Sequence, residues 1–440
     1  MSATIAVDDL RVGMFIHLDL GWWAHPFALS SFRLTSPDQI ATIKGLGVKE
    51  LRWSPEKSGA PSPEDPAPAA NVAVTAEAEA TAQGASQSAS QPGGAETSQQ
   101  VQLRERRVQL AAQREANRVC ARQYNEAARS WKDAADLVPT KPEGARQTAE
   151  ALTRALLSKM MVDGELCIRV LAEVQADRAT THALNVAVIS LLMGRVFGFN
   201  ENEMLDVGVG ALLHDVGKLE LPERVRFADP QAAAADQALY REHVARGVAQ
   251  GKRMGLSAGA MLVIAQHHEM ADGSGFPQKL NVDRMTAAAR IVALVNRYDN
   301  LCDPAVPAHA LTPHEALSLI FAQTRTKFDA SMLNAFIRMM GVYPPGSVVQ
   351  LTDDRLALVT NVNSTRPLKP RVLLFDPAVP VDEALHINLE QHTDLGIRRS
   401  LRPQQLSHDA LQYLSPRQCV VYFFEPAQAS NSGYGQEIAA

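Results

Sequence analysis

Five histidines and one aspartate are the residues of this chain whose types and spacing could support chemistry. His267 and His268 close an apolar run, Ala260–Ala265, and a turn rich in Gly, Ser and Pro follows at Gly273–Pro277. The change from helical periodicity to turn residues places both imidazoles at a helix end. Three more histidines lie upstream next to apolar helical segments: His182, His214 and His243.

Asp215 directly follows His214 at the end of a nearly uninterrupted apolar segment, residues 204–213. A carboxylate placed against an apolar wall is costly unless its charge is compensated, and a bound cation would compensate it. Imidazoles and a carboxylate without a thiolate suit iron, manganese or zinc at a catalytic site better than a structural zinc. The pattern therefore predicts a metal centre.

Two metal ions that share a carboxylate can clamp a phosphodiester and ionise a water molecule. Asp215 is the candidate bridge because its two oxygens can be shared and the neighbouring histidine points into the same site. Lys218, one turn beyond His214, could bind a phosphate oxygen through its compact ammonium group. We therefore expect an enzyme, a metal-dependent phosphohydrolase, with Asp215 and Lys218 as catalytic residues and Lys218 also binding substrate.

The bulk composition limits the class of protein. The chain has 440 residues, a formal net charge of −5 and four widely spaced cysteines. This length predicts two or three domains, and the charge argues against a partner that is duplex nucleic acid. The cysteine spacing fits a reducing compartment without disulfides. Neither a signal peptide nor a membrane span is apparent, so we expect a cytoplasmic protein.

Residues 1–57 are expected to form a small α+β domain. Strands are predicted at Val12–Leu18 and Val48–Trp53, and a helix between them begins after Ser36, a suitable N-cap before a proline. Residues 58–99 are rich in Ala, Pro, Ser, Gln, Gly and Glu, a composition with too little apolar surface to fold. We predict a disordered linker there.

Residues 100–175 are predicted to be a helical connector. It comprises a long polar helix at 100–138, a second helix after Pro142 and a third beginning near Asp163. The first of these carries a thin apolar stripe, which indicates either a solvated helix or one that forms a homodimer.

The histidines lie in a helical core at 176–345. The period then changes to that of strands, so residues 346–440 are predicted to be a β-rich C-terminal extension. The fold class is thus mainly α, with a small α+β domain before the helical core and a short β-rich extension after it.

These motifs resemble the HD-GYP family, a branch of the HD phosphohydrolases that degrades the bacterial second messenger cyclic di-GMP. The resemblance covers roughly 176–345 and implies an HD-type helical bundle. The opening unit, with Leu10-Arg11-Val12-Gly13-Met14, is similar to a small uncharacterised domain that often precedes HD-GYP. The resemblance rests on the following residues: His182, His214-Asp215-Val216-Gly217-Lys218, His243 with Gly247, and 267–277, where Gly275-Phe276-Pro277 stands for Gly-Tyr-Pro.

The resemblance also implies a ligand set, cofactors and partners. The implied metal ligands are His182, His214, Asp215, His243, His267 and His268, and the implied cofactors are two divalent ions, iron or manganese. Residues Gly275, Phe276 and Pro277 correspond to a surface that contacts partner domains, such as GGDEF-domain or other signalling proteins.

The sequence departs from the family pattern at three places. Asn296 stands where the family has a metal-binding aspartate, so a neutral amide oxygen is the predicted ligand there. The run Cys302–Pro307 replaces a basic segment that helps to hold the substrate phosphate. Arg178 stands where some trinuclear members carry a glutamate, which argues against a third metal.

Three hypotheses about function follow from these observations. The first is a phosphodiesterase that hydrolyses cyclic di-GMP to linear pGpG and on to GMP. The second is a degenerate HD-GYP module that binds a nucleotide or a partner protein with little catalysis, as Asn296 and the missing basic segment favour. The third is an HD phosphohydrolase that acts on a different nucleotide.

Overall fold

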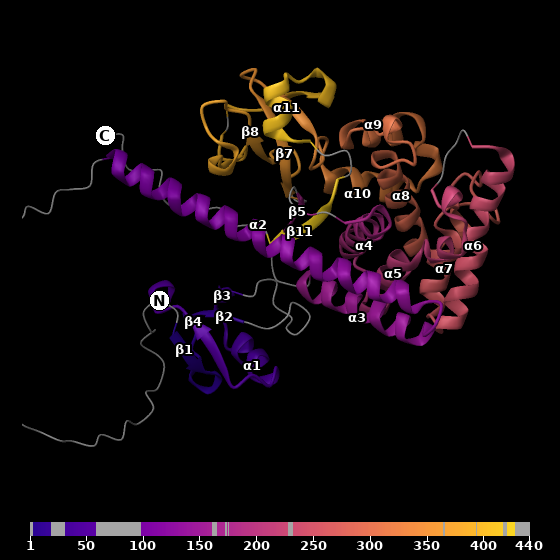
Figure 1. Ribbon diagram of the computed structural model, residues 1–440, viewed down its shortest axis with the longest axis horizontal. Helices are drawn as coiled ribbons and strands as arrows, with labels where there is room; N and C mark the ends of the chain where they lie inside the picture. The colour runs from indigo at the N-terminus through magenta and orange to yellow at the C-terminus, as the bar shows by residue number, and fades with distance from the viewer. Residues whose placement is uncertain are drawn as a thin grey trace, which may run out of the picture. The chain divides into compact units, whose positions relative to one another are not determined.

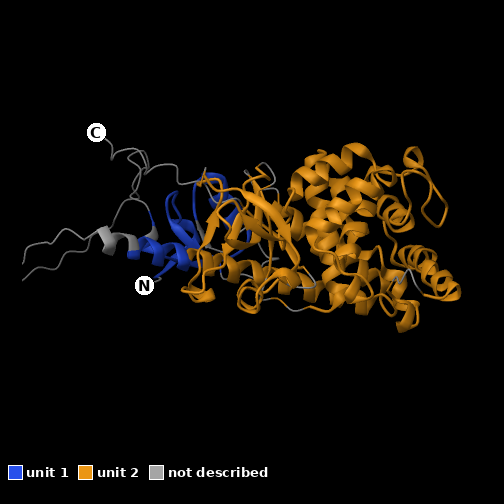
Figure 2. Ribbon diagram, turned by 90° about the horizontal axis from the view of Figure 1, so that it is seen from above, with its two compact units in different colours: residues 1–20, 29–111 blue, residues 21–28, 112–440 orange. Residues whose placement is uncertain are grey.

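The computed structural model describes residues 3–18, 31–58, 98–160, 165–171, 174, 176–227, 232–363, 366–392, 394–416 and 420–426. The chain divides into two compact units, residues 1–20 with 29–111 and residues 21–28 with 112–440 (Figure 2). The predicted linker and the Trp-rich loop with Trp22, Trp23 and Phe27 lie outside the described residues, apart from the first and last residues of the linker.

The opening part of the first unit is a small antiparallel sheet with one helix, as predicted. Its strands pair in the order β1-β4-β2-β3. Ser36 caps the helix by accepting a hydrogen bond from the Gln39 backbone N–H, and Pro37 occupies the first helical position. The elements are β1 (Ala3–Ala6), β2 (Phe15–His17), β3 (Ser31–Arg33), α1 (Pro37–Gly45) and β4 (Glu50–Trp53).

The second unit begins within the long helix α2 (Ser98–Leu137), which the polar stretch at 100–138 predicted. From Ala112 onward the apolar stripe of α2 packs into the main core through Cys120, Tyr124 and Ala127. This part of the stripe is therefore accounted for by packing within one chain. A homodimer formed through α2 stays a prediction.

The segment after α3 (Pro142–Met160) corrects the sequence-based expectation of a third helix near Asp163. Leu166–Val170 is a strand, β5, which pairs antiparallel with two later strands, β7 and β11. The buried ion pair between Arg169 Nη1 and Glu425 Oε2, at 2.5 Å, joins β5 to β11. Pairing across almost 260 residues decides this segment, which is too short and whose burial does not alternate regularly enough to reveal a strand from the sequence.

The helical core surrounds α4, which contacts α5, α8, α10 and β11 (Figure 1). Among the described helices, α4 is long and apolar enough to cross a membrane, but 78% of its apolar stretch is buried within the protein. Its side chains therefore form the centre of the bundle. The helices are α4 (Arg178–Val196), α5 (Glu201–Leu213), α6 (Ala234–Met254), α7 (Ala258–Gln266), α8 (Ala287–Cys302), α9 (Pro313–Gln323) and α10 (Ala330–Met340).

The C-terminal part is an antiparallel sheet, as expected, but β5 enters it from before the helical core, so the sheet is built from both flanks. The sheet meets the core where Asn185 of α4 donates to the Val420 carbonyl and accepts from the Tyr422 N–H, each at 2.8 Å. Its other elements are β6 (Val348–Leu351), β7 (Leu356–Asn363), β8 (Arg371–Leu374), β9 (His386–Asn388), β10 (Ile397–Leu401), α11 (His408–Leu414) and β11 (Tyr422–Pro426).

Lys159 on α3 generates a prediction about stability. The residue is 1% exposed, and burial lowers the pKa of its ammonium group from 10.5 to about 7, although the charge of Glu126 partly opposes this. Between pH 7 and 10.5 the unfolded chain binds a proton that the folded chain does not, so the free energy of unfolding rises with pH in this range. We expect Lys159→Met to stabilise the protein by about 1–4 kcal/mol at pH 7.

This gain should shrink as the pH approaches 10, and denaturant titrations at several pH values would measure it. Lys141→Met, at an exposed position, is the matched control and should show no such trend. A Lys159→Met gain that grows with pH would contradict the assignment.

Candidate metal centre

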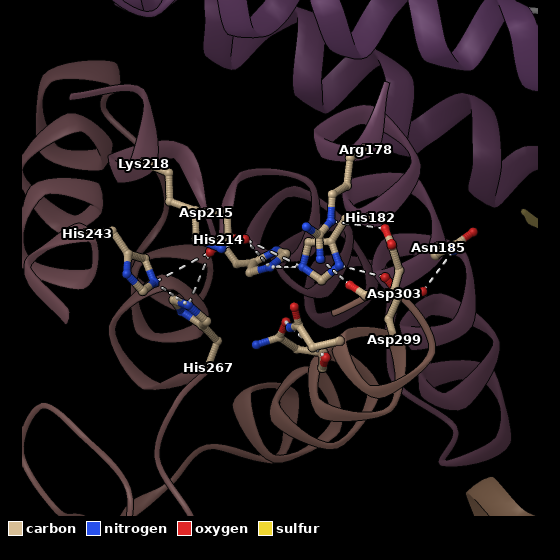
Figure 3. Close-up of polar contacts among 12 residues, drawn as sticks. Arg178, His182, Asn185, His214, Asp215, Lys218, His243, His267, Asp299 and Asp303 are labelled. Atoms are coloured by element: carbon tan, nitrogen blue, oxygen red, sulfur yellow. Dashed lines mark hydrogen bonds and ion pairs between the residues drawn. The ribbon is translucent and has the colours of Figure 1, made fainter. Parts of the chain in front are cut away.

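Helices and their ends bring the predicted histidines together around Asp215 (Figure 3). His182 lies in the second turn of α4, and His214 is the C-cap of α5. His243 lies on α6, and His267 is the C-cap of α7 with His268 directly after it. The helix-end positions predicted from the sequence are therefore confirmed for His214 and His267.

Three of these imidazoles are oriented by the backbone of their own helices. In each case Nδ1 lies close to the carbonyl oxygen three residues earlier: 2.7 Å for His214 to Ala211, 2.6 Å for His243 to Tyr240 and 2.8 Å for His267 to Ile264. A carbonyl can only accept, so each Nδ1 carries a proton. In the neutral ring Nε2 is then left as a lone-pair donor.

The Nε2 atoms of these three histidines and of His182 converge on one another. His182 Nε2 lies 3.0 Å from His214 Nε2, and His243 Nε2 lies 3.1 Å from His267 Nε2. Asp215 Oδ2 lies 3.5 Å from His182 Nε2, and Asp215 Oδ1 lies 3.4 Å from His243 Nε2. Lone pairs that face one another and a carboxylate need a cation between them.

Two overlapping groups of donors result. One consists of His182, His214 and Asp215, and the other of Asp215, His243, His267 and His268, with the donor atoms of each group within 4.8 Å of one another. Asp215 belongs to both groups. Its Oδ1 atom is buried without a hydrogen-bond partner, which is the kind of orphaned oxygen that a metal ion would satisfy. The residues present therefore fit two metal ions that share one carboxylate.

The electrostatics of the site keep its donors available. Burial lowers the pKa of His243 to about 4, and burial together with neighbouring imidazoles holds the pKa values of His267 and His268 well below their usual range. Burial would raise the pKa of Asp215, but the charge of Lys218 and the hydrogen-bonding His214 beside it hold it well below normal. At neutral pH these imidazoles are neutral and the carboxylate is ionised, as metal ligands must be.

Lys218 lies in the 3₁₀ helix η4 (Val216–Glu220), one turn beyond Asp215. Its Nζ atom is 2.5 Å from Asp215 Oδ2 and 5.2 Å from the centre of the Tyr240 ring. Burial lowers the pKa of this ammonium group, but the Asp215 carboxylate and Tyr240 more than offset that, so its net pKa is raised. Lys218 is therefore a permanent cation beside the donor groups.

Asp299 on α8 is a functional residue that the sequence analysis missed. Its Oδ2 atom lies 2.6 Å from His182 Nδ1, and its Oδ1 atom accepts a hydrogen bond of 2.8 Å from Asn185. A carboxylate on Nδ1 fixes the tautomer of His182 and makes Nε2 a better ligand. The signal was available, because Asp299 lies one turn after Asn296 on the same helix.

Asn296 is 3% exposed, and its Oδ1 atom accepts a hydrogen bond of 2.6 Å from Asn300. Its role as a metal ligand stays a prediction. Arg178 lies one turn before His182, and its Nε atom is 3.1 Å from Asp303 Oδ2. The position at which some trinuclear relatives carry a carboxylate is therefore occupied by a paired cation.

The turn after His268 packs against the histidines of the centre. The fully buried Glu269 accepts hydrogen bonds from the backbone N–H groups of Gln278 and Leu280. Phe276 stacks on the His268 ring, with centroids 4.5 Å apart. Gly275 is buried, and a Cβ there would lie 2.5 Å from backbone atoms of residues 268–270. The predicted contact of 275–277 with partner proteins stays a prediction.

A pocket of about 370 Å³ leads to the His182 side of the centre. Its polar lining includes His182, Asp215, Lys218 and Arg178. Its volume falls within the range of small-molecule sites, roughly 300–1,000 Å³. The site therefore combines a predicted metal pair, a cation and room for an organic ligand.

Comparison with known families agrees with this reading. Residues 2–158 match DUF3391, a domain of unknown function, and residues 165–332 match the HD domain. Fold and donor set are those of an HD-domain phosphohydrolase. The chain carries an HD domain preceded by an N-terminal DUF3391 domain, and its relatives are HD-GYP proteins, as the resemblance of its motifs implied.

The chain is similar to several known proteins. A cyclic di-GMP phosphodiesterase of Pseudomonas aeruginosa is 25% identical over 90% of this chain and 89% of its own length. A cyclic di-GMP phosphodiesterase response regulator of Xanthomonas campestris pv. campestris is 26% identical over 44% of this chain and 54% of that protein. A solved HDG"Y"P protein of Bdellovibrio bacteriovorus aligns with 76% of this chain and 98% of its own, at 14% identity and a TM-score of 0.40.

The overlap of the donor groups predicts how metal content responds to mutation. His182→Ala removes a ligand from one group and His267→Ala from the other, so each variant should lose about one of two metal ions. Asp215→Ala should lose both, because Asp215 belongs to both groups. Metal-to-protein ratios from plasma mass spectrometry would measure this, with the exposed His309→Ala as control. Equal losses in His182→Ala and Asp215→Ala would contradict a shared ligand.

Asp299→Asn tests the support of His182. The amide must still accept from Asn185, so its NH₂ group would face His182 Nδ1 and favour the wrong tautomer. We expect the affinity for Mn²⁺ on the His182 side to fall about 10–100-fold, while the other side is unchanged. Calorimetric titration would resolve the two sides. Asp283→Asn at an exposed position is the control, and an unchanged affinity in Asp299→Asn would refute the role.

Proposed function

We propose that this chain is a metal-dependent phosphodiesterase that hydrolyses cyclic di-GMP to linear pGpG and on to GMP. The single observation that carries the proposal is Asp215, which belongs to two groups of metal donors at the end of an organic-sized pocket. Two relatives named as cyclic di-GMP phosphodiesterases support the choice of substrate. Iron or manganese is the proposed metal, because the resemblance to HD-GYP proteins implies these ions and the nitrogen and oxygen donors suit them.

The residues of the chain have distinct roles in this reaction. When bound, the metal pair would lower the pKa of a water molecule and neutralise charge on the phosphate. Asp215 is shared by the two donor groups and so fixes their positions relative to each other. Asp299 keeps His182 in the tautomer whose Nε2 lone pair can bind a metal. Lys218, which lines the same pocket, binds a non-bridging phosphate oxygen and stabilises the charge that develops in the transition state.

The alternative proposal is a module that binds nucleotide without efficient hydrolysis. Asn296 favours it, because a neutral amide replaces a charged ligand and already accepts a hydrogen bond from Asn300. Bound metal without hydrolysis of cyclic di-GMP in the presence of added Mn²⁺ or Fe²⁺ would favour this alternative. A panel of other cyclic dinucleotides would show whether the substrate differs instead.

Variants of the centre test the proposed reaction. His214→Ala and Asp215→Ala should lose metal and turnover together, whereas Lys218→Met should keep its metal and lose about 100–1,000-fold in kcat. Product analysis by liquid chromatography would measure the formation of pGpG and GMP. Lys252→Met removes an exposed lysine outside the pocket and is the matched control. Turnover that survives in Asp215→Ala would refute the assignment.

A further inference from the structure

The pocket beside the metal centre has two chemically different parts. The proposed reaction uses the polar part, where His182, Asp215 and Lys218 lie. The rest of the lining exposes mostly apolar surface and comes from α2, α4, the end of α5, η4 and the chain after it, and the end of α8. It also has polar members at its edge: Asp177, Glu223, Arg226, Asn300 and Asp303. Its apolar side chains include Trp131, Ala135, Ala183, Leu212, Leu219 and Phe227. Binding of a phosphodiester group alone does not require such an apolar wall.

Two large apolar side chains of this wall are held at the surface. Phe227 is 37% exposed and Leu219 is 42% exposed. A single exposed apolar side chain needs no explanation, but two that line one pocket next to a cluster of metal donors indicate a ligand. The ligand must therefore cover apolar surface as well as bind the polar part.

The aromatic rings of the wall are fixed in place. The indole N–H of Trp131 donates to the Leu212 carbonyl at 2.9 Å, two residues before His214. The guanidinium carbon of Arg178 lies 4.3 Å from the centroid of Phe227, while Arg178 Nε binds Asp303. A ring held by a cation that is itself anchored forms a rigid platform, and such platforms bind flat ligands at little entropic cost.

We propose, on the basis of the proposed function, that Trp131 and Phe227 form a nucleobase-binding subsite of this pocket. A nucleotide combines a flat base, which stacks on aromatic faces, with a phosphate that suits Lys218 and the metal donors. The subsite assigns to Arg178, Trp131 and Phe227 a positioning role for the substrate. It also supplies binding energy that the missing basic segment at Cys302–Pro307 does not.

GMP and ribose 5-phosphate are the probes that test this subsite, because they share a sugar phosphate and differ in the base. Calorimetry on the Mn²⁺-loaded protein should show GMP binding about 10-fold more tightly than ribose 5-phosphate. Phe227→Ala should weaken GMP binding about 10-fold and leave ribose 5-phosphate unchanged. GMP, but not ribose 5-phosphate, should also change the fluorescence of Trp131, a change that Trp131→Phe removes.

Phe321→Ala is the matched control, because Phe321 is 50% exposed on α9 and does not line the pocket. It should leave both affinities unchanged, and circular dichroism would verify the fold of every variant. GMP that binds no more tightly than ribose 5-phosphate, or not measurably, overturns the subsite. So does an equal loss for both ligands in Phe227→Ala.

Turnover of cyclic di-GMP separates this inference from the proposed function. A protein that prefers GMP through Phe227 but does not hydrolyse cyclic di-GMP supports the subsite and refutes the phosphodiesterase. Hydrolysis of cyclic di-GMP without any preference for GMP over ribose 5-phosphate supports the phosphodiesterase and refutes the subsite.

Discussion

The site depends on one electrostatic constraint, the convergence of neutral imidazole lone pairs on the carboxylate of Asp215. Backbone carbonyls accept hydrogen bonds from Nδ1 of His214, His243 and His267, which leaves their Nε2 atoms as acceptors. The Nε2 atoms then meet in two pairs, His182 with His214 at 3.0 Å and His243 with His267 at 3.1 Å. Such a cluster is repulsive without a cation. Its assembly is consistent with a metal centre of the HD-domain type, which the helix ends bring together.

Hydrogen bonds connect the C-terminal sheet to His182, one of the predicted metal ligands. Asn185 accepts a hydrogen bond from the Tyr422 N–H of β11 and donates one to Asp299, which in turn orients His182. The antiparallel sheet is thus connected to the metal centre through three side chains. β11, which pairs with β5 from before the helical core, is the strand that contacts α4.

Much of the centre could be predicted from the sequence because its ligands sit at helix ends, where local signals are strong. The histidines, Asp215, and most helices of the core followed from apolar periodicity and turn residues. Strand β5 could not be predicted in this way, because its partners lie about 200 and 260 residues away. Trp131 and Phe227 could not be predicted for a related reason, because only tertiary packing brings them to the pocket. Asp299, one turn after Asn296 on α8, could have been found from the sequence.

The most direct test of the shared carboxylate is electron paramagnetic resonance of the protein loaded with Mn²⁺. Two ions bridged by Asp215 would lie about 3.5–4 Å apart and be magnetically coupled. We expect the multiline spectrum of a coupled pair at full loading, and its loss in Asp215→Ala. The six-line spectrum of isolated Mn²⁺ at full loading of the native protein would contradict a bridged pair.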